Sequence, residues 1–301
     1  MRLLIATAAT LALLLMGPGA ALALDSCPGK RPSQRVIATG QGQLESAVVD
    51  DRGRLLFTSV FKSALMRIER PGTTPRLVAD GIPIPGGLAL DPRGRIYVGS
   101  GNSIANGLLA PAQGLAQLYR VDPRTGAKRV FATGLSMANG LVRRSDGTFF
   151  ASDDFAPSVD RISPRGKVKR AWSTAPSTNG LALDPSERFL YANRSFGPTT
   201  QVLRIDVRRP ERVIEWATPP AAEASSVLDG MAIDSRGRLL LAAFGPGELW
   251  RSDGRGKLCA LARGLGSSLS AVAVGRGRRG FRAGRIYTVA FNGTITEIAL
   301  R

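Results

Sequence analysis

Residues 35–40 read Arg-Val-Ile-Ala-Thr-Gly, and residues 129–134 read Arg-Val-Phe-Ala-Thr-Gly. The second copy ends a complete repeat of the chain, whereas the first stands at the N-terminus, ahead of any complete repeat. The last repeat stops at Arg301 before it reaches the same strand. A strand that is missing at one end and surplus at the other predicts a closed ring, in which the N-terminal strand completes the last unit and hides an open sheet edge.

The unit between these ends recurs six times. It consists of an apolar inner strand, a Gly- or Asp-containing turn, a second apolar strand, a loop, a third strand and, except in the last unit, a fourth strand. The residues that open the second strands are Arg54, Arg95, Thr148, Arg188, Arg238 and Arg285, separated by 41, 53, 40, 50 and 47 positions. Such units are typical of propeller blades. The sequence therefore predicts an all-β, six-bladed β-propeller over residues 35–301, with the N-terminal strand closing the last blade.

The N-terminus predicts export. Arg2 is followed by an uncharged apolar segment (residues 3–16), a Gly-Pro-Gly break and a small-x-small cleavage site at residues 21–23. This pattern is typical of a signal peptide over residues 1–23, and its apolar segment is too short to span a bilayer. A retained N-terminal anchor is the alternative. We expect a secreted or periplasmic protein, cleaved near Ala23, with residues 24–34 as a linker and no transmembrane segment.

The chain has two cysteines, Cys27 and Cys259. In an oxidising compartment, one widely separated pair favours a disulfide over a metal site. The ring closure supports this pairing, because it places the outer strand of the fifth blade beside the segment that precedes the closing strand. Two free thiols are the alternative.

The formal net charge is +18, and most of it comes from arginines spread thinly along the chain. Basic and aromatic residues do not alternate on one element, and export also argues against a nucleic-acid partner. The favoured interpretation is a basic surface that keeps the protein soluble. Weak attraction to anionic polymers of the cell envelope is the alternative.

The chain contains no histidine. This excludes a Ser-His-Asp or Cys-His nucleophile and a His-ligated zinc ion, and it removes the commonest general base near neutral pH. An enzyme of this composition must therefore use carboxylates and a metal.

One repeat position faces the channel of the predicted ring, at the start of each inner strand. It holds Glu45, Gly86, Asn139, Asn179, Asp229 and Ser270. Four of the six are Glu, Asn or Asp. Such hard oxygen ligands favour calcium, with magnesium or manganese less suited. We predict one divalent ion held by Glu45, Asn139, Asn179 and Asp229. The alternative is that the Asn-Gly and Asp-Gly pairs are ordinary turn residues that tolerate left-handed backbone.

The same positions carry motifs of a known family. Leu44-Glu45-Ser46, Ala138-Asn139-Gly140, Thr178-Asn179-Gly180-Leu-Ala-Leu and Leu228-Asp229-Gly230-Met231 resemble motifs of the gluconolactonase/regucalcin (senescence marker protein) family, which is related to drug-responsive lactonases and paraoxonases. The resemblance implies metal binding by Glu45, Asn179 and Asp229, with Asn139 as a further ligand and Asp229 as the favoured general base. The His pair of paraoxonase lactone hydrolysis has no counterpart, which argues against paraoxonase-type substrates.

We therefore expect a secreted, calcium-dependent hydrolase that opens a lactone or a related ester. The metal would polarise the carbonyl group, and Asp229 would accept the proton of the attacking water. Substrate contacts are expected from Asn139 and from loops on the same face, at Asn102, Asp153, Arg194 and Phe196. The alternatives are a non-catalytic propeller that binds a ligand or a protein around a structural metal, and another reaction on the same scaffold.

Overall fold

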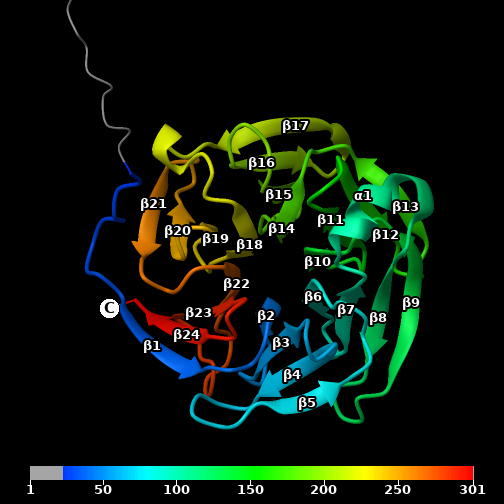
Figure 1. The fold of residues 1–301 in the computed structure, drawn as a ribbon, viewed down its shortest axis with the longest axis horizontal. Helices are drawn as coiled ribbons and strands as arrows, with labels where there is room; N and C mark the ends of the chain where they lie inside the picture. Colours follow the sequence, from blue (N-terminus) through cyan, green and yellow to red (C-terminus); the bar gives the residue numbers. More distant parts are fainter. Residues whose placement is uncertain (1–22, 301) are drawn as a thin grey trace, which may run out of the picture.

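The structure is a computed structural model that describes residues 23–300. The predicted signal peptide therefore lies almost wholly outside the described residues. Six four-stranded antiparallel sheets stand around a central axis (Figure 1). The prediction of an all-β, six-bladed propeller is confirmed. Among the described residues, no helix is long and apolar enough to cross a membrane.

Each of the first five blades is continuous in sequence, and its first strand is the innermost. The first blade contains β2 (Leu44–Val49), β3 (Leu55–Ser59), β4 (Ala64–Ile68) and β5 (Arg76–Ala79). The second contains β6 (Leu88–Leu90), β7 (Ile96–Ser100), β8 (Ala116–Val121) and β9 (Lys128–Leu135). The third contains β10 (Leu141–Arg143), β11 (Phe149–Asp153), β12 (Ser158–Ile162) and β13 (Val168–Ser173). The fourth contains β14 (Thr178–Leu183), β15 (Phe189–Arg194), β16 (Gln201–Asp206) and β17 (Arg209–Ala217). The fifth contains β18 (Leu228–Ile233), β19 (Leu239–Ala243), β20 (Glu248–Ser252) and β21 (Leu258–Ala262).

The sixth blade joins the two ends of the chain. It contains β22 (Leu269–Val274), β23 (Arg285–Ala290), β24 (Ile295–Ala299) and, outermost, β1 (Ser33–Ala38). Strand β1 pairs antiparallel with β24, with Ser33 opposite Ala299 and Val36 opposite Thr296. Figure 1 shows β1, in blue, beside the red C-terminal strand. The predicted closure by the N-terminal strand is confirmed.

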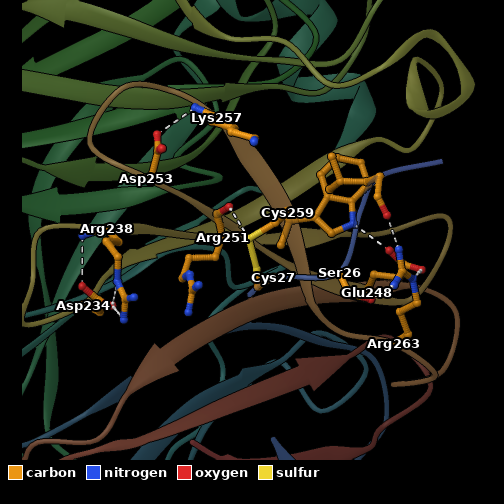
Figure 2. The surroundings of a disulfide bond; sticks show 12 residues. Ser26, Cys27, Asp234, Arg238, Glu248, Arg251, Asp253, Lys257, Cys259 and Arg263 are labelled. Atoms are coloured by element: carbon orange, nitrogen blue, oxygen red, sulfur yellow. Dashed lines mark hydrogen bonds and ion pairs between the residues drawn. A yellow bond between two sulfur atoms is a disulfide. The ribbon is translucent and has the colours of Figure 1, made fainter. Parts of the chain in front are cut away.

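A disulfide joins Cys27 to Cys259, with their Cα atoms 4.8 Å apart, as predicted. Figure 2 shows it at the outer strand of the fifth blade, β21. The segment predicted as a linker is partly bound to the same strand. The Cys27 N–H donates to the Ala260 carbonyl at 2.9 Å, and the Ala260 N–H donates to the Asp25 carbonyl at 2.7 Å. The N-terminal segment thus holds the fifth blade before β1 completes the sixth.

The hydrophobic core lies between the blades. The buried apolar side chains of the described residues form six clusters, and each cluster joins facing surfaces of two neighbouring blades. Alternation along the strands produces this arrangement, because successive side chains enter the interfaces on opposite sides of one blade. The ring is therefore rigid around its axis, where the inner strands meet.

Two short helices were not predicted. Helix α1 (Ile104–Gln113) follows β7, and a single 3-10 turn, η1 (Ala221–Glu223), follows β17. Helix α1 lies over the third blade (Figure 1), and its Gly107 approaches Met137 and Phe155 there. Helix α1 has no counterpart in the other blades, so the repeat pattern of the propeller did not predict it.

Candidate metal centre

The inner strands run in register around the axis, so equivalent residues of neighbouring blades meet. The Ser152 hydroxyl of the third blade donates to the Asn179 carbonyl of the fourth at 2.6 Å. The Asn193 amide of the fourth blade donates in the same way to the Asp229 carbonyl of the fifth, also at 2.6 Å. The backbone carbonyls of Asn179 and Asp229 are therefore each held by the preceding blade, through a polar side chain on its second strand.

The four predicted ligands lie together at one end of a central cavity. The cavity has a volume of about 410 Å³ and is lined by the six inner strands. Glu45, Asn139, Asn179 and Asp229 all line it, and each is at most 7% exposed. The residues that follow the inner strands, including Arg276, line its opposite end.

A β-bulge aims three of these side chains. In blades one, four and five, two residues of the first strand lie opposite a single residue of the second, between Leu44 and Ala47, Thr178 and Leu181, and Leu228 and Met231. These two-residue segments contain Glu45, Asn179 and Asp229. A bulge leaves residues outside the regular ladder and turns their side chains, which explains why these three reach the axis.

The turn interpretation is wrong for two of the three pairs, whereas Asn139-Gly140 lies just before β10 and outside any strand. Asn179-Gly180 and Asp229-Gly230 lie within strands β14 and β18. Glycine is required there by close packing of the inner strands, because a Cβ atom on Gly180 would lie 2.4 Å from the Asp229 carbonyl oxygen. The Asn179-Gly180 and Asp229-Gly230 pairs therefore lie where the backbones of neighbouring inner strands pack closely at the axis.

The site concentrates buried negative charge. Burial, together with the nearby Asp154 carboxylate, raises the pKa of Glu45 to about 8, although the Asn102 amide partly offsets the rise. Burial and the charges of Glu45 and Asp154 raise the pKa of Asp229 well above its ordinary value. Burial, and then Asp153, raise the pKa of Asp154 to about 7. Three carboxylates that oppose each other's ionisation are stabilised by protons or by a cation.

Asp154 is a site residue that the sequence analysis missed. It is 6% exposed, and one of its carboxylate oxygens lies 3.5 Å from the Asn179 amide nitrogen. Side-chain alternation could have found it, because Asp154 stands two positions after the inward-facing Ser152. The predicted substrate residue Asp153 instead faces away and is fully buried. It accepts the backbone N–H groups of Phe155 and Ala156, which fixes the loop after β11.

The other predicted substrate residues lie around the cavity without lining it. Asn102 stands beside Gly86 and Glu45. Arg194 is half-buried and donates to the Phe196 carbonyl and to the Gln201 side chain. Phe196 is 43% exposed and stacks on Phe155, with ring centroids 5.3 Å apart. Arg194 and Phe196 therefore belong to the rim, whereas Asn102 adjoins the predicted ligand Glu45.

The donor set fits a hard cation. Asn102 Oδ1 and Asp154 Oδ1 are buried, and neither has a hydrogen-bond partner among residues 23–300. Uncompensated acceptor oxygens beside buried carboxylates suit an ion with oxygen ligands such as calcium. Within the described part of the chain, no three His, Cys, Asp or Glu side chains form a metal-binding group. Half of the predicted ligands are asparagines, so the fit rests on amide and carboxylate oxygens together.

Calcium should stabilise the protein most at high pH. Without metal, the folded state binds more protons than the unfolded state, because the pKa values of Glu45 and Asp154 are raised. Metal-free stability should therefore fall as the pH rises from about 5 to 8. We expect a fall in Tm of roughly 5 °C or more, since each kcal/mol corresponds to about 2–4 °C in a large domain. Added calcium should reverse it at pH 8.

Differential scanning calorimetry after chelator treatment, at pH 5 and pH 8, checks this expectation. Melting that is indifferent to both pH and calcium would contradict the metal site.

Comparison with known proteins supports the resemblance found in the motifs. Residues 151–276 match the family model described as the SMP-30/Gluconolactonase/LRE-like region. The matched part runs from β11 to the loop after β22, so it includes Asn179 and Asp229 but not Glu45 or Asn139. None of the curated proteins compared with the chain matches it.

Solved structures share the fold over nearly the whole chain. A gluconolactonase from Xanthomonas campestris is 15% identical with a TM-score of 0.71, and 90% of each chain is covered. Regucalcin from Agrobacterium tumefaciens, a calcium-binding protein, is 14% identical with a TM-score of 0.70, over 93% of this chain and 96% of that one. A luciferin-regenerating enzyme is 15% identical with a TM-score of 0.67, over 89% and 95%. At these identities the similarity shows the fold.

Proposed function

We propose that the protein is a calcium-dependent hydrolase that opens a lactone or a related carboxylic ester. The observation that carries this proposal is the convergence of Glu45, Asn139, Asn179 and Asp229 at one mouth of the channel, with buried acceptor oxygens beside them. The gluconolactonase and regucalcin folds support it, and so does the family match over residues 151–276. We also propose export after cleavage near Ala23, since the disulfide is compatible with an oxidising compartment.

The side chains divide the chemistry between them. Glu45, Asn179 and Asp229 would hold the ion, and Asn139 would hold the ion or the substrate. A calcium ion there would supply Lewis-acid stabilisation of the negative charge that develops on the carbonyl oxygen. Asp229 would accept a proton from the attacking water. Asp154 is a second candidate for this role, because it is buried beside the cluster and one of its oxygens has no partner in the described residues.

The rim favours a substrate with an apolar portion. Loops that follow the second strands carry Phe61, which is 79% exposed, and Phe196. Helix α1 adds Ile104 and Leu108, which are 61% and 63% exposed. Apolar side chains that ring a polar site hold an apolar group of a ligand while its polar part reaches the centre. A lactone with a hydrocarbon substituent fits this rim better than a bare sugar lactone.

A panel of lactones and aryl esters, assayed with and without chelator, tests the proposal. We expect turnover of at least one lactone, its loss in the presence of chelator, and its recovery when calcium is added back. Alkyl-substituted lactones should react better than sugar lactones. Turnover that survives complete removal of metal would exclude the mechanism. Failure to open any lactone or ester would favour a ligand- or protein-binding propeller that uses its metal for structure.

A further inference from the structure

The far end of the channel carries a repeated, arginine-bearing turn. Residues 50–54, 91–95 and 234–238 share the sequence Asp-x-Arg-Gly-Arg and connect the first and second strands of their blades. One Asp oxygen accepts the backbone N–H groups of the third and fifth residues. The other oxygen accepts the Nε–H of the last Arg at 2.5–2.8 Å. The last Arg is therefore fixed, and the middle Arg is left free to meet solvent.

The middle arginines of the first two turns, Arg52 and Arg93, border a cleft of about 820 Å³. Eight arginines and four carboxylates line it. Three of these carboxylates already have partners. Asp50 accepts a hydrogen bond from Arg54, and Asp91 accepts one from Arg95. Glu187 accepts the backbone N–H and the hydroxyl group of Ser145.

Five of the lining arginines have no ion-pair partner among residues 23–300. They are Arg52, Arg93, Arg124, Arg143 and Arg276. Asp51 is the one lining carboxylate without a fixed partner in the described residues. The cleft is therefore strongly positive.

The backbone around this cleft is held in place. Arg276 belongs to the loop between β22 and β23, and the Phe281 N–H of that loop donates to the Gly53 carbonyl at 2.9 Å. Phe281 is fully buried against Tyr287, with ring centroids 4.8 Å apart. Because the loop is anchored on the first blade, the backbone segments that carry the exposed side chains of Arg52 and Arg276 are held next to each other. Such preorganisation lowers the cost of binding.

We propose that this cleft binds a small soluble anion carrying several phosphate groups. Clustered guanidinium groups repel one another, and phosphate oxygens relieve this repulsion through paired, charge-assisted hydrogen bonds. The concave shape admits a small molecule, whereas a flat membrane surface would meet the exposed turns and leave the cleft unfilled. The cleft shares Arg143, Glu187 and Arg276 with the central cavity, so the anion would sit at the channel mouth opposite Glu45 and Asp229. A six-residue inner strand separates the two ends by about 17 Å. The inference is independent of the proposed hydrolase activity.

Titration of the full protein with inorganic tripolyphosphate, by calorimetry at 50 and 300 mM NaCl, tests the cleft. We expect one ion per chain and weaker binding at the higher salt, because exposed charges are screened. The double variant Arg52→Ala/Arg93→Ala should weaken binding 10-fold or more. The matched control is Arg236→Ala/Arg255→Ala, which removes the same charge from exposed residues outside the cleft. Arg236 is the middle arginine of the third turn, and Arg255 has the same position in the similar turn Asp253-Gly-Arg-Gly-Lys257, between β20 and β21. The control should stay within twofold of the wild type.

Three results would overturn the proposal. One is the absence of tripolyphosphate binding at millimolar concentration, and another is equal weakening by both double variants, which would indicate general surface attraction. The third is binding to phosphatidylglycerol vesicles without binding to tripolyphosphate. The melting temperatures of both double variants should match that of the wild type, because the four side chains are exposed and unpaired in the described structure.

Discussion

Asp229→Asn is expected to lower kcat/KM for lactone opening by roughly 100-fold or more, the usual worth of general base catalysis. The substitution keeps an oxygen ligand of nearly the same shape but removes a negative charge and a proton acceptor. Asp229 is 6% exposed, and its backbone carbonyl stays bound by Asn193, so the strand should keep its position. Steady-state kinetics across pH, with calcium in excess, measure the effect.

Asn179→Ala provides the matched comparison on the neighbouring inner strand. It removes a proposed ligand without removing a proton acceptor, so calcium affinity should weaken first and excess calcium should restore much of the rate. If excess calcium also restores Asp229→Asn, the base lies elsewhere. A large, calcium-insensitive loss in Asp154→Asn would then assign that role to Asp154. Loss of the low-pH limb of the rate profile, where protonation of the base lowers the rate, distinguishes a base from a residue that only positions the ion.

Removing the disulfide with Cys27→Ala/Cys259→Ala is expected to lower the free energy of unfolding by about 3–5 kcal/mol. The bond joins residues 232 positions apart, and the chain-entropy model gives about 5 kcal/mol for a loop of that length. The loss should be smaller than this limit if the denatured chain keeps residual structure. Denaturant unfolding of the two proteins measures the difference.

The other contacts of the N-terminal segment do not depend on the cysteines, so the double variant removes the disulfide and leaves these contacts in place. Leu24 stays buried in the fifth blade, and the hydrogen bonds between the N-terminal segment and Ala260 do not involve sulfur. The single variant Cys27→Ala should therefore lose as much stability as the double variant. Lactone turnover at room temperature should change little, because the bond lies on the outer strand and the site lies at the axis (Figures 1 and 2). An unfolding midpoint unchanged in the double variant would contradict the expected role.

The sequence alone determined the architecture, because a propeller repeats one unit at a regular interval. The paired segments at residues 35–40 and 129–134 identified the closing strand, and the structure pairs it with β24. The same alignment brought Glu45, Asn139, Asn179 and Asp229 to one repeat position, and all four line one cavity. Because equivalent positions of a repeat occupy equivalent places in the ring, aligning the repeats shows which distant residues lie close together. These features could therefore be predicted without coordinates.

Tertiary structure alone decided what departs from the repeat. The order of neighbours at the axis places Asp154 beside Glu45 and Asp229, although Asp153 is next to it in sequence and faces the other way. Helix α1 and the loop that carries Arg276 are insertions in single blades, so no second copy predicted where they would lie. The crowding that requires Gly180 also depends on how closely two inner strands approach. Strand periodicity determines which elements form and which residues lie at the same height along the channel axis. The direction of a side chain at a bulge and the burial of a charged group depend instead on contacts between blades.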